Sequence, residues 1–127
     1  MFQSLEIFQT SHAMARHAAA RQAMTATNLA NADTPGYQAR AMPSFAETMA
    51  QGQTSGLRAT RSGHVGGTAT ATAAPSQTAA AEASPNGNSV SVEQEMLRGV
   101  EIQREHSRAL TIYKHSLDVL RASIGRR

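Results

Sequence analysis

Two stretches of the chain, one near each end, have the hydrophobic periodicity of an α-helix. In residues 1–32, apolar or small side chains recur every three or four positions, with no Gly or Pro to interrupt them. These positions are Leu5, Phe8, Ala15, Ala19, Ala26 and Leu29, and His12 and Gln22 fill the same spacing. The spacing predicts one amphipathic helix. Because its stripe is mostly alanine, the helix permits close approach of a second helix but buries little apolar area by itself, so we expect it to need a partner.

Residues 89–127 have the stronger pattern, a heptad repeat with two rows of seam positions. One row contains Met96, Gln103, Leu110, Leu117 and Ile124. The other contains Val92, Gly99, His106, Tyr113 and Leu120. Such a repeat is typical of a helix that packs lengthwise on another helix. We predict a long helix that ends near Ile124, with Gly125 as its stop.

Between these helices the hydrophobic pattern is lost. Of the 39 residues from Gln51 to Ser89, 33 are Ala, Gly, Ser, Thr, Pro, Gln or Asn. Such a segment cannot bury enough apolar surface to offset the entropy that it loses on ordering. We therefore predict an all-α chain, with long N- and C-terminal helices paired as a coiled coil and an irregular low-complexity central segment. The predicted parts are an N-terminal helix (1–32), a turn segment (33–50), a linker or surface excursion (51–88) and a C-terminal helix (89–127).

The composition excludes several classes of protein. The 127 residues include no Cys, which excludes thiolate catalysis, disulfides and Cys-based metal sites. The formal net charge of +3 is not gathered into a basic block, so nucleic acid is not a favoured partner. The longest stretch without Asp, Glu, Lys or Arg, residues 62–81, is rich in Gly, Ala and Thr, so no membrane span is predicted. No basic residue precedes Ala13-Met14-Ala15, so we expect no cleaved secretory signal there.

The histidines do not have the spacing of a metal site. His12 and His17 are five positions apart, and His106 and His115 are nine apart, whereas two ligands on one helix face are four apart. A polar residue in a helical seam, such as His106, more often sets the register of packing. The chain also has no phosphate-binding loop and no nucleophile elbow. We predict no enzymatic activity, no cofactor and no metal.

The sharpest local feature is the run Asn28-Leu29-Ala30-Asn31-Ala32-Asp33-Thr34-Pro35-Gly36-Tyr37, in which a helical pattern meets Pro-Gly. Pro35 and Gly36 suit the central positions of a type II turn, where Gly supplies the positive φ, and the proline excludes Thr34 from helical conformation. Asn28, Asn31 and Asp33 have side chains that can bond to backbone groups freed at a helix end. A simple helix stop also explains the Asn, Pro and Gly.

The same run resembles the signature near the N-terminus of bacterial flagellar rod, hook and hook-associated proteins. Its continuation, Gln38-Ala39-Arg40 with Phe45 nearby, is more similar to the proximal-rod members than to the distal-rod or hook members. Residues 86–96, Asn-Gly-Asn-Ser-Val-Ser-Val-Glu-Gln-Glu-Met, resemble the segment that opens the C-terminal helix of that family. Ser91 stands where the family often has Asp, and a serine can also serve as an N-cap. The resemblance leaves residues 51–85 unmatched.

This resemblance implies a structural subunit of the proximal rod of the flagellar basal body. It implies export through the flagellar type III apparatus, polymerisation in the periplasm, and coiled coils packed around the export channel to form a torque-transmitting shaft. The implied partners are other rod proteins, the MS ring with its small adaptor protein, and the export apparatus. The residues expected to pack helices are Leu5, Phe8, Ala15, Ala19, Met96, Leu110, Tyr113, Leu117, Leu120 and Ile124. Those expected to set the bend are Asn28, Asn31, Asp33, Thr34, Pro35, Gly36 and Tyr37.

Two other functions remain open from the sequence. A free helical interaction protein, such as an export chaperone or a regulatory coiled coil, shares the long helices and the low complexity, but it has no need of the Asn28–Tyr37 run. A DNA-associated helix that uses Arg104, Arg108, Lys114 and Arg121 predicts binding with a steep dependence on salt.

Overall fold

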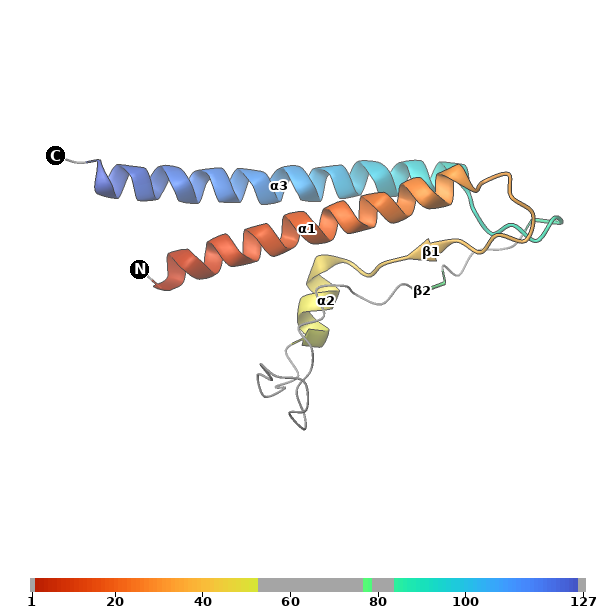
Figure 1. Cartoon of the computed structure of the whole chain (residues 1–127), viewed down its shortest axis with the longest axis horizontal. Coiled ribbons are helices and arrows are strands. Elements are labelled where there is room, and N and C mark those ends of the chain that lie inside the picture. Colours follow the sequence, from red (N-terminus) through yellow and green to blue (C-terminus); the bar gives the residue numbers. More distant parts are fainter. Residues whose placement is uncertain (1, 53–76, 79–83, 126–127) are drawn as a thin grey trace, which may run out of the picture.

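The computed structural model describes residues 2–52, 77–78 and 84–125, and this part of the chain is mostly helical (Figure 1). Its elements, in chain order, are α1 (Phe2–Ala30), β1 (Arg40–Ala41), α2 (Phe45–Gly52), β2 (Gln77–Thr78) and α3 (Val92–Ile124). The long N-terminal and C-terminal helices pack against each other. The predicted all-α fold class is confirmed.

α1 and α3 lie side by side and antiparallel, so their free ends are at one end of the helix pair and their connected ends at the other (Figure 1). Near the free ends, Phe8 and Tyr113 pack edge to face with ring centroids 5.2 Å apart. Farther along, Arg21 Nη1 and Glu105 Oε2 form an ion pair at 2.6 Å. This half-buried pair and the aromatic contact fix the register between the two helices.

The face that α3 turns toward α1 follows a heptad repeat, but one row differs from the prediction. The buried residues of α3 are Glu95, Ile102 and Ala109, one position before Met96, Gln103 and Leu110. Gly99, in the other predicted row, does face α1, because a Cβ there would lie 4.0 Å from side-chain atoms of Gln22 and Thr25. The small residues Gly99 and Ala109 let the helices approach closely, whereas Met96 and Leu110 in the same seam would hold them apart.

The core of the described chain is thin. Its buried apolar residues are Ala18, Ala39, Ile102 and Ala109. Three of these four are alanine, and hydrophobic stabilisation scales with the apolar area removed from water. The helix pair therefore gains little from its own core, in agreement with the expectation that its stripe needs a partner.

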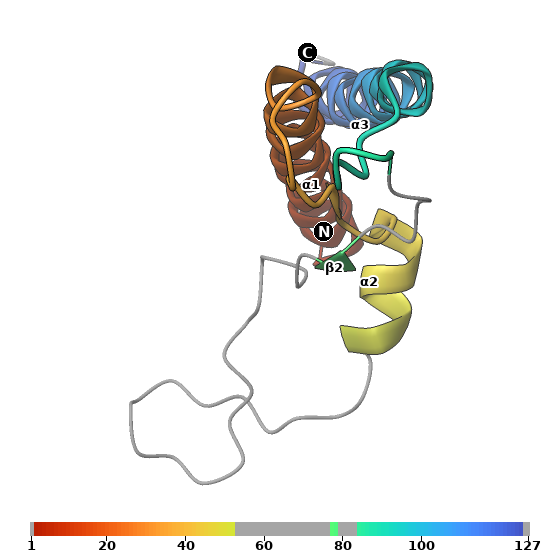
Figure 2. The ribbon, with the colours of Figure 1, turned by 90° about the vertical axis from the view of Figure 1, so that its right-hand side faces the viewer.

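After α1 the chain turns back along the helix pair (Figure 1), and the end-on view shows β2 and α2 on one side of the pair (Figure 2). β1 pairs antiparallel with β2, with Arg40 opposite Thr78, and both β1 and α2 contact α1. Neither this short pairing nor α2 was predicted within the turn segment. The prediction of an irregular segment over 51–88 falls largely on residues 53–76 and 79–83, which lie outside the described residues. Within the described helices, none combines the length and the hydropathy needed to cross a membrane.

Candidate assembly site

The turn after α1 and the turn before α3 interlock at the connected end of the helix pair. Gly36 N donates a hydrogen bond to Asn86 O at 3.1 Å, and Ser89 N donates to Tyr37 O at 3.0 Å. Ala39 N donates to Ser89 Oγ at 2.8 Å, across 50 positions of sequence. The two runs that resemble the flagellar signature thus form one structural unit, which we call the interlocked turns (residues 28–41 and 84–90).

Two glycines lie where the interlocked turns touch. Gly36 has a φ of 72° and Gly87 a φ of 79°, the left-handed region that glycine enters without steric cost. The positive φ predicted for Gly36 is confirmed. A Cβ on Gly87 would lie 3.4 Å from Gly36 Cα, so the two turns meet backbone to backbone.

Asn28 ties the end of α1 to β1. Its side chain is buried, and its Nδ2 donates to Arg40 O at 2.7 Å. Its Oδ1 accepts from Arg40 N at 3.1 Å and from the Tyr37 hydroxyl at 3.2 Å. The carboxamide therefore pairs with Arg40 as a neighbouring strand would, presenting a donor and an acceptor side by side. The sequence led us to expect a bond to the helix end instead.

The carbonyl groups freed at the end of α1 are bonded by Asn88, from the other run. Its Nδ2 lies 2.9 Å from Asn31 O and 2.8 Å from both Ala32 O and Thr34 O. Its Oδ1 accepts from Val90 N at 2.7 Å, and the residue is buried. Helix ends leave carbonyl groups without intrahelical partners, and a buried end needs another donor. Sequence reasoning missed this role, although the Asn86-Gly87-Asn88 run was its visible signal.

The remaining turn residues act locally. Asn31 Nδ2 donates to Thr27 O at 2.8 Å, as expected of a residue that bonds groups at a helix end. Tyr37 N donates to Thr34 O at 3.3 Å and closes the turn around Pro35. Asp33, Thr34, Pro35 and Gly36 are exposed at its tip.

Ser91 stands at the N-cap position of α3 with extended backbone, but its side chain makes no capping hydrogen bond. The predicted position is therefore confirmed and the predicted capping contact is not. Behind it, Glu95 is buried on α3 and its Oε1 bonds to Arg98 Nη1 at 2.5 Å. The start of α3 is thus held by its acidic first turn and by Asn88 rather than by a serine cap.

The predicted helix-packing residues divide into two groups within one chain. Phe8 contacts Tyr113, and Ala15, Leu117 and Leu120 are half-buried. Met96, Leu110 and Ile124 are 63%, 51% and 81% exposed, and Ala19 is also exposed. The side chain of Leu5 lies outside the described residues. Within the described chain one pair of the first group is in contact and its other members are partly buried, whereas the second group lies at the surface.

A groove runs along the seam between α1 and α3. It has a volume of about 580 Å³ and is lined by Ala18, Ala19, Gln22, Ala23, Ala26, Ile102, Gln103 and His106. Its wall on α1 is almost entirely alanine, which allows another helix to approach closely. Ala19, Ala26 and Gln103 belong to the predicted packing rows. These three residues thus border an open groove.

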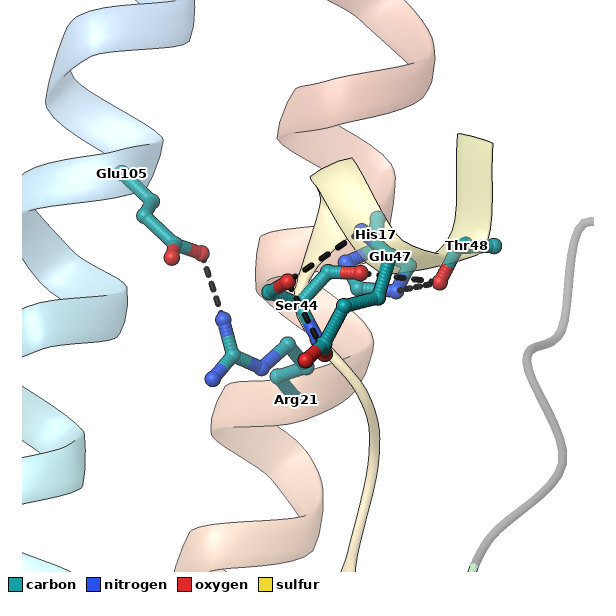
Figure 3. A network of polar contacts seen from close by, with 6 residues as sticks. All are labelled: His17, Arg21, Ser44, Glu47, Thr48 and Glu105. Carbon is teal, nitrogen blue, oxygen red and sulfur yellow. Dashed lines mark hydrogen bonds and ion pairs between the residues drawn. The ribbon is translucent and has the colours of Figure 1, made fainter. Parts of the chain in front are cut away.

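A polar network connects α2 to α1 and α1 to α3 (Figure 3). Thr48 Oγ1 lies 3.3 Å from His17 Nε2, and the rings of His17 and Phe45 pack edge to face at 5.7 Å. Burial lowers the pKa of His17, the charge of Arg21 lowers it further, and Glu105 opposes this shift. The contacts of His17 with Phe45 and Thr48 were not predicted, because α2 itself was not predicted from the sequence.

The N-terminus of α2 has a capping box. Ser44 N donates to Glu47 Oε2 at 2.7 Å, and Glu47 N donates to Ser44 Oγ at 3.3 Å. Hydrogen bonds from the backbone and the side chain of Ser44 lower the pKa of Glu47. The Ser-x-x-Glu spacing at residues 44–47 was the sequence signal for this helix.

In residues 2–52, 77–78 and 84–125, no group of three or more His, Asp or Glu is placed to hold a metal ion. The features that the structure does gather are the interlocked turns, the apolar groove and the exposed row on α3. All three are means of packing and of fixing chain direction.

A profile of a known protein family matches part of the chain. The profile of a family described as "Flagella basal body rod protein" matches residues 12–38, which cover most of α1 and the first of the interlocked turns. No curated protein matches the chain. The match at residues 12–38 supports the flagellar basal body rod family, and with it a structural role in the rod and a place in the basal body.

Proposed function

We propose that this chain is a proximal-rod subunit of the FlgB type, which polymerises through its α1–α3 helix pair into the drive shaft around the export channel. The observation that carries the proposal is the exposed apolar row of Met96, Leu110 and Ile124 beside the alanine-walled groove. A heptad row is expected to be buried against another helix. Among residues 2–52, 77–78 and 84–125 no helix covers this row, which favours a partner from another subunit.

The thin core supports the same conclusion. The buried apolar residues of the two long helices are Ala18, Ile102 and Ala109, so the pair gains little free energy from its own apolar packing. Contacts that exist only in the assembled state stabilise the folded chain by mass action. Assembly into coiled coils with neighbouring subunits supplies the missing apolar contact.

The interlocked turns favour a rod subunit over a free helical interaction protein. A simple helix stop needs neither the bonds from Asn28 to Arg40 nor those from Asn88 to the end of α1. Here both asparagines are buried and fully engaged, and Asn28 lies within the matched residues 12–38. The flagellar signature is therefore part of a specific structure rather than an incidental end of a helix.

The finer assignments rest on the resemblance of the sequence. Gln38-Ala39-Arg40 with Phe45 favours the proximal rod over the distal rod and the hook. The proposed partners are other rod proteins and the MS ring with its small adaptor protein. Delivery through the type III export apparatus, and assembly in the periplasm, complete the proposal.

Circular dichroism of the purified chain, alone and mixed with the adjacent rod proteins, tests this function. We expect low helicity alone and a gain in helicity on mixing, together with large particles in sedimentation. Leu110→Ser removes an exposed seam side chain, so this variant is expected to lose both the gain in helicity and the large particles. High helicity alone, unchanged by mixing, would contradict the proposal and favour a free interaction protein.

A further inference from the structure

The contact between α2 and α1 is built around one buried histidine. His17 is only 5% exposed, although it lies on a helix that is largely solvent-facing. Phe45 packs on its ring, and the Thr48 hydroxyl oxygen lies 3.3 Å from its Nε2 (Figure 3). Both residues belong to α2, so the position of this helix depends on the state of the imidazole.

The hydrogen bonds identify that state. Thr48 Oγ1 donates its one hydrogen to Ser44 O at 3.0 Å, so its oxygen accepts from His17 and Nε2 carries a proton. His17 Nδ1 is buried and has no hydrogen-bond partner among the described residues. A second proton would enter at Nδ1 and place a charged N–H where it meets no acceptor, which is costly in a buried site.

The charged groups around the ring do not offset that cost. On α1, Arg21 lies one turn beyond His17 and repels an imidazolium. On α3, the Glu105 carboxylate is bound to Arg21 at 2.6 Å. On α2, the Glu47 carboxylate accepts hydrogen bonds from Ser44 N and Ser44 Oγ at 2.7 and 3.0 Å. Both acids that face the site are therefore engaged elsewhere.

We propose that His17 is a proton-operated latch, in which the neutral imidazole holds α2 against α1 and protonation at Nδ1 releases it. A released histidine takes up a proton near its ordinary pKa of about 6.5. Burial lowers the pKa of His17 in the docked state, so the released state binds the proton more tightly. The equilibrium constant for docking therefore has its full value above about pH 6.5. Below that pH it falls about tenfold per pH unit, until the lower pKa of the docked state is reached. Release changes the surface that α1 presents to a partner.

Spin-label distance measurements on the full chain test the latch. The chain contains no Cys, so nitroxides attached to Ala20→Cys on α1 and Met49→Cys on α2, both exposed positions, are the only labels. Labelled chains are diluted with unlabelled ones and measured in whichever form is helical, free or co-assembled, so the result does not depend on the proposed function. We expect one narrow distance distribution at about pH 7.5 and a broader, longer one at about pH 5.

Two variants separate the latch from a general effect of acid. His17→Gln keeps an N–H that can reach Thr48 but does not titrate, so its distribution is expected to stay narrow at both pH values. His12→Gln, an exposed histidine on the same helix, is expected to behave as the unmodified chain. If the distance distribution of the unmodified chain does not change with pH, or is broad at both pH values, the proposal is overturned. It is also overturned if His17→Gln responds to pH as the unmodified chain does.

A second measurement tests the latch without a substitution at His17, for the case in which His17→Gln does not hold α2 against α1. Ring signals of isotopically labelled His17, followed by NMR in the unmodified chain, are expected to titrate with a midpoint below about 6.5 that coincides with the distance change. A midpoint at or above that value overturns the latch.

Discussion

At the scale of single residues, two buried asparagine side chains make hydrogen bonds to main-chain groups that other main-chain groups usually make. Asn28 pairs with the main chain of Arg40, and Asn88 bonds to carbonyl groups at the end of α1. A carboxamide suits both tasks because it has donors and an acceptor on one planar group. These side chains set the direction in which the chain leaves α1 and enters α3.

Asn88→Ala is expected to lower the free energy of unfolding by about 1–3 kcal/mol, because it removes the bonds from the Asn88 amide to Asn31 O, Ala32 O and Thr34 O and the acceptor of Val90 N. Urea denaturation of the form that is helical, free or co-assembled, followed by circular dichroism, measures this loss. Gln38→Ala is the matched control, since its exposed amide makes one long bond to Gly87 O at 3.3 Å and its removal should cost less than about 0.5 kcal/mol. Equal losses in the two variants would contradict the role of Asn88.

The two glycines of the interlocked turns make a second prediction. Gly36→Ala and Gly87→Ala both force a side chain into the left-handed region, at about 1–2 kcal/mol each. The two losses are expected to be alike, because a Cβ at Gly87 would make an ordinary van der Waals contact with Gly36 Cα at 3.4 Å and a Cβ at Gly36 would meet no atom within 4 Å. Midpoints of thermal unfolding, measured on the form that is helical, free or co-assembled, compare the two variants. A loss well above about 2 kcal/mol in Gly87→Ala alone would contradict ordinary packing between the turns.

At the scale of elements, the sequence predicts the helices better than their contacts. Periodicity places both long helices, and Gly125 stands at the end of α3 as expected. Periodicity does not distinguish Ala109 from Leu110 as the residue facing α1, because that choice depends on how closely the helices approach. α2 is eight residues long, too short for a periodic pattern, and its anchor His17 lies distant in sequence. The Asn86-Gly87-Asn88 run marks a turn, but nothing local shows that the partners of Asn88 lie 54 or more positions away.

Leu117→Asp is expected to abolish incorporation into the rod and swimming motility. Leu117 is half-buried on α3 in a predicted packing row, and a carboxylate there loses its hydration when helices pack over it. Swimming in soft agar and the protein content of purified basal bodies measure the effect. Thr111→Asp, on an exposed position of the same helix, is the control and should preserve motility. Normal swimming of Leu117→Asp would exclude this position from the seam.

At the scale of the whole molecule, α1 and α3 are held together at both ends of the helix pair, and apolar side chains are exposed along it. The interlocked turns fix one end of the helix pair, and the contact of Phe8 with Tyr113 fixes the other. The groove and two members of the exposed row, Met96 and Leu110, lie between them along the length of the pair. A long helix pair with a lengthwise apolar surface is suited to side-by-side assembly, as the proposed shaft requires.

Because the side chains that line the groove include no Asp, Glu, Lys or Arg, assembly is expected to depend on temperature more than on salt. Burial of apolar surface is driven by entropy near room temperature and weakens on cooling, so particles should dissociate toward about 4 °C. Raising NaCl from about 0.05 to 0.5 M screens exposed charges without weakening apolar contact, so the particle fraction should fall less than about twofold. Analytical ultracentrifugation across both ranges measures this. A fall of tenfold or more in the particle fraction with salt would assign assembly to charged contacts. Salt-sensitive capture of duplex DNA would instead support a nucleic-acid surface formed by Arg104, Arg108, Lys114 and Arg121 of α3.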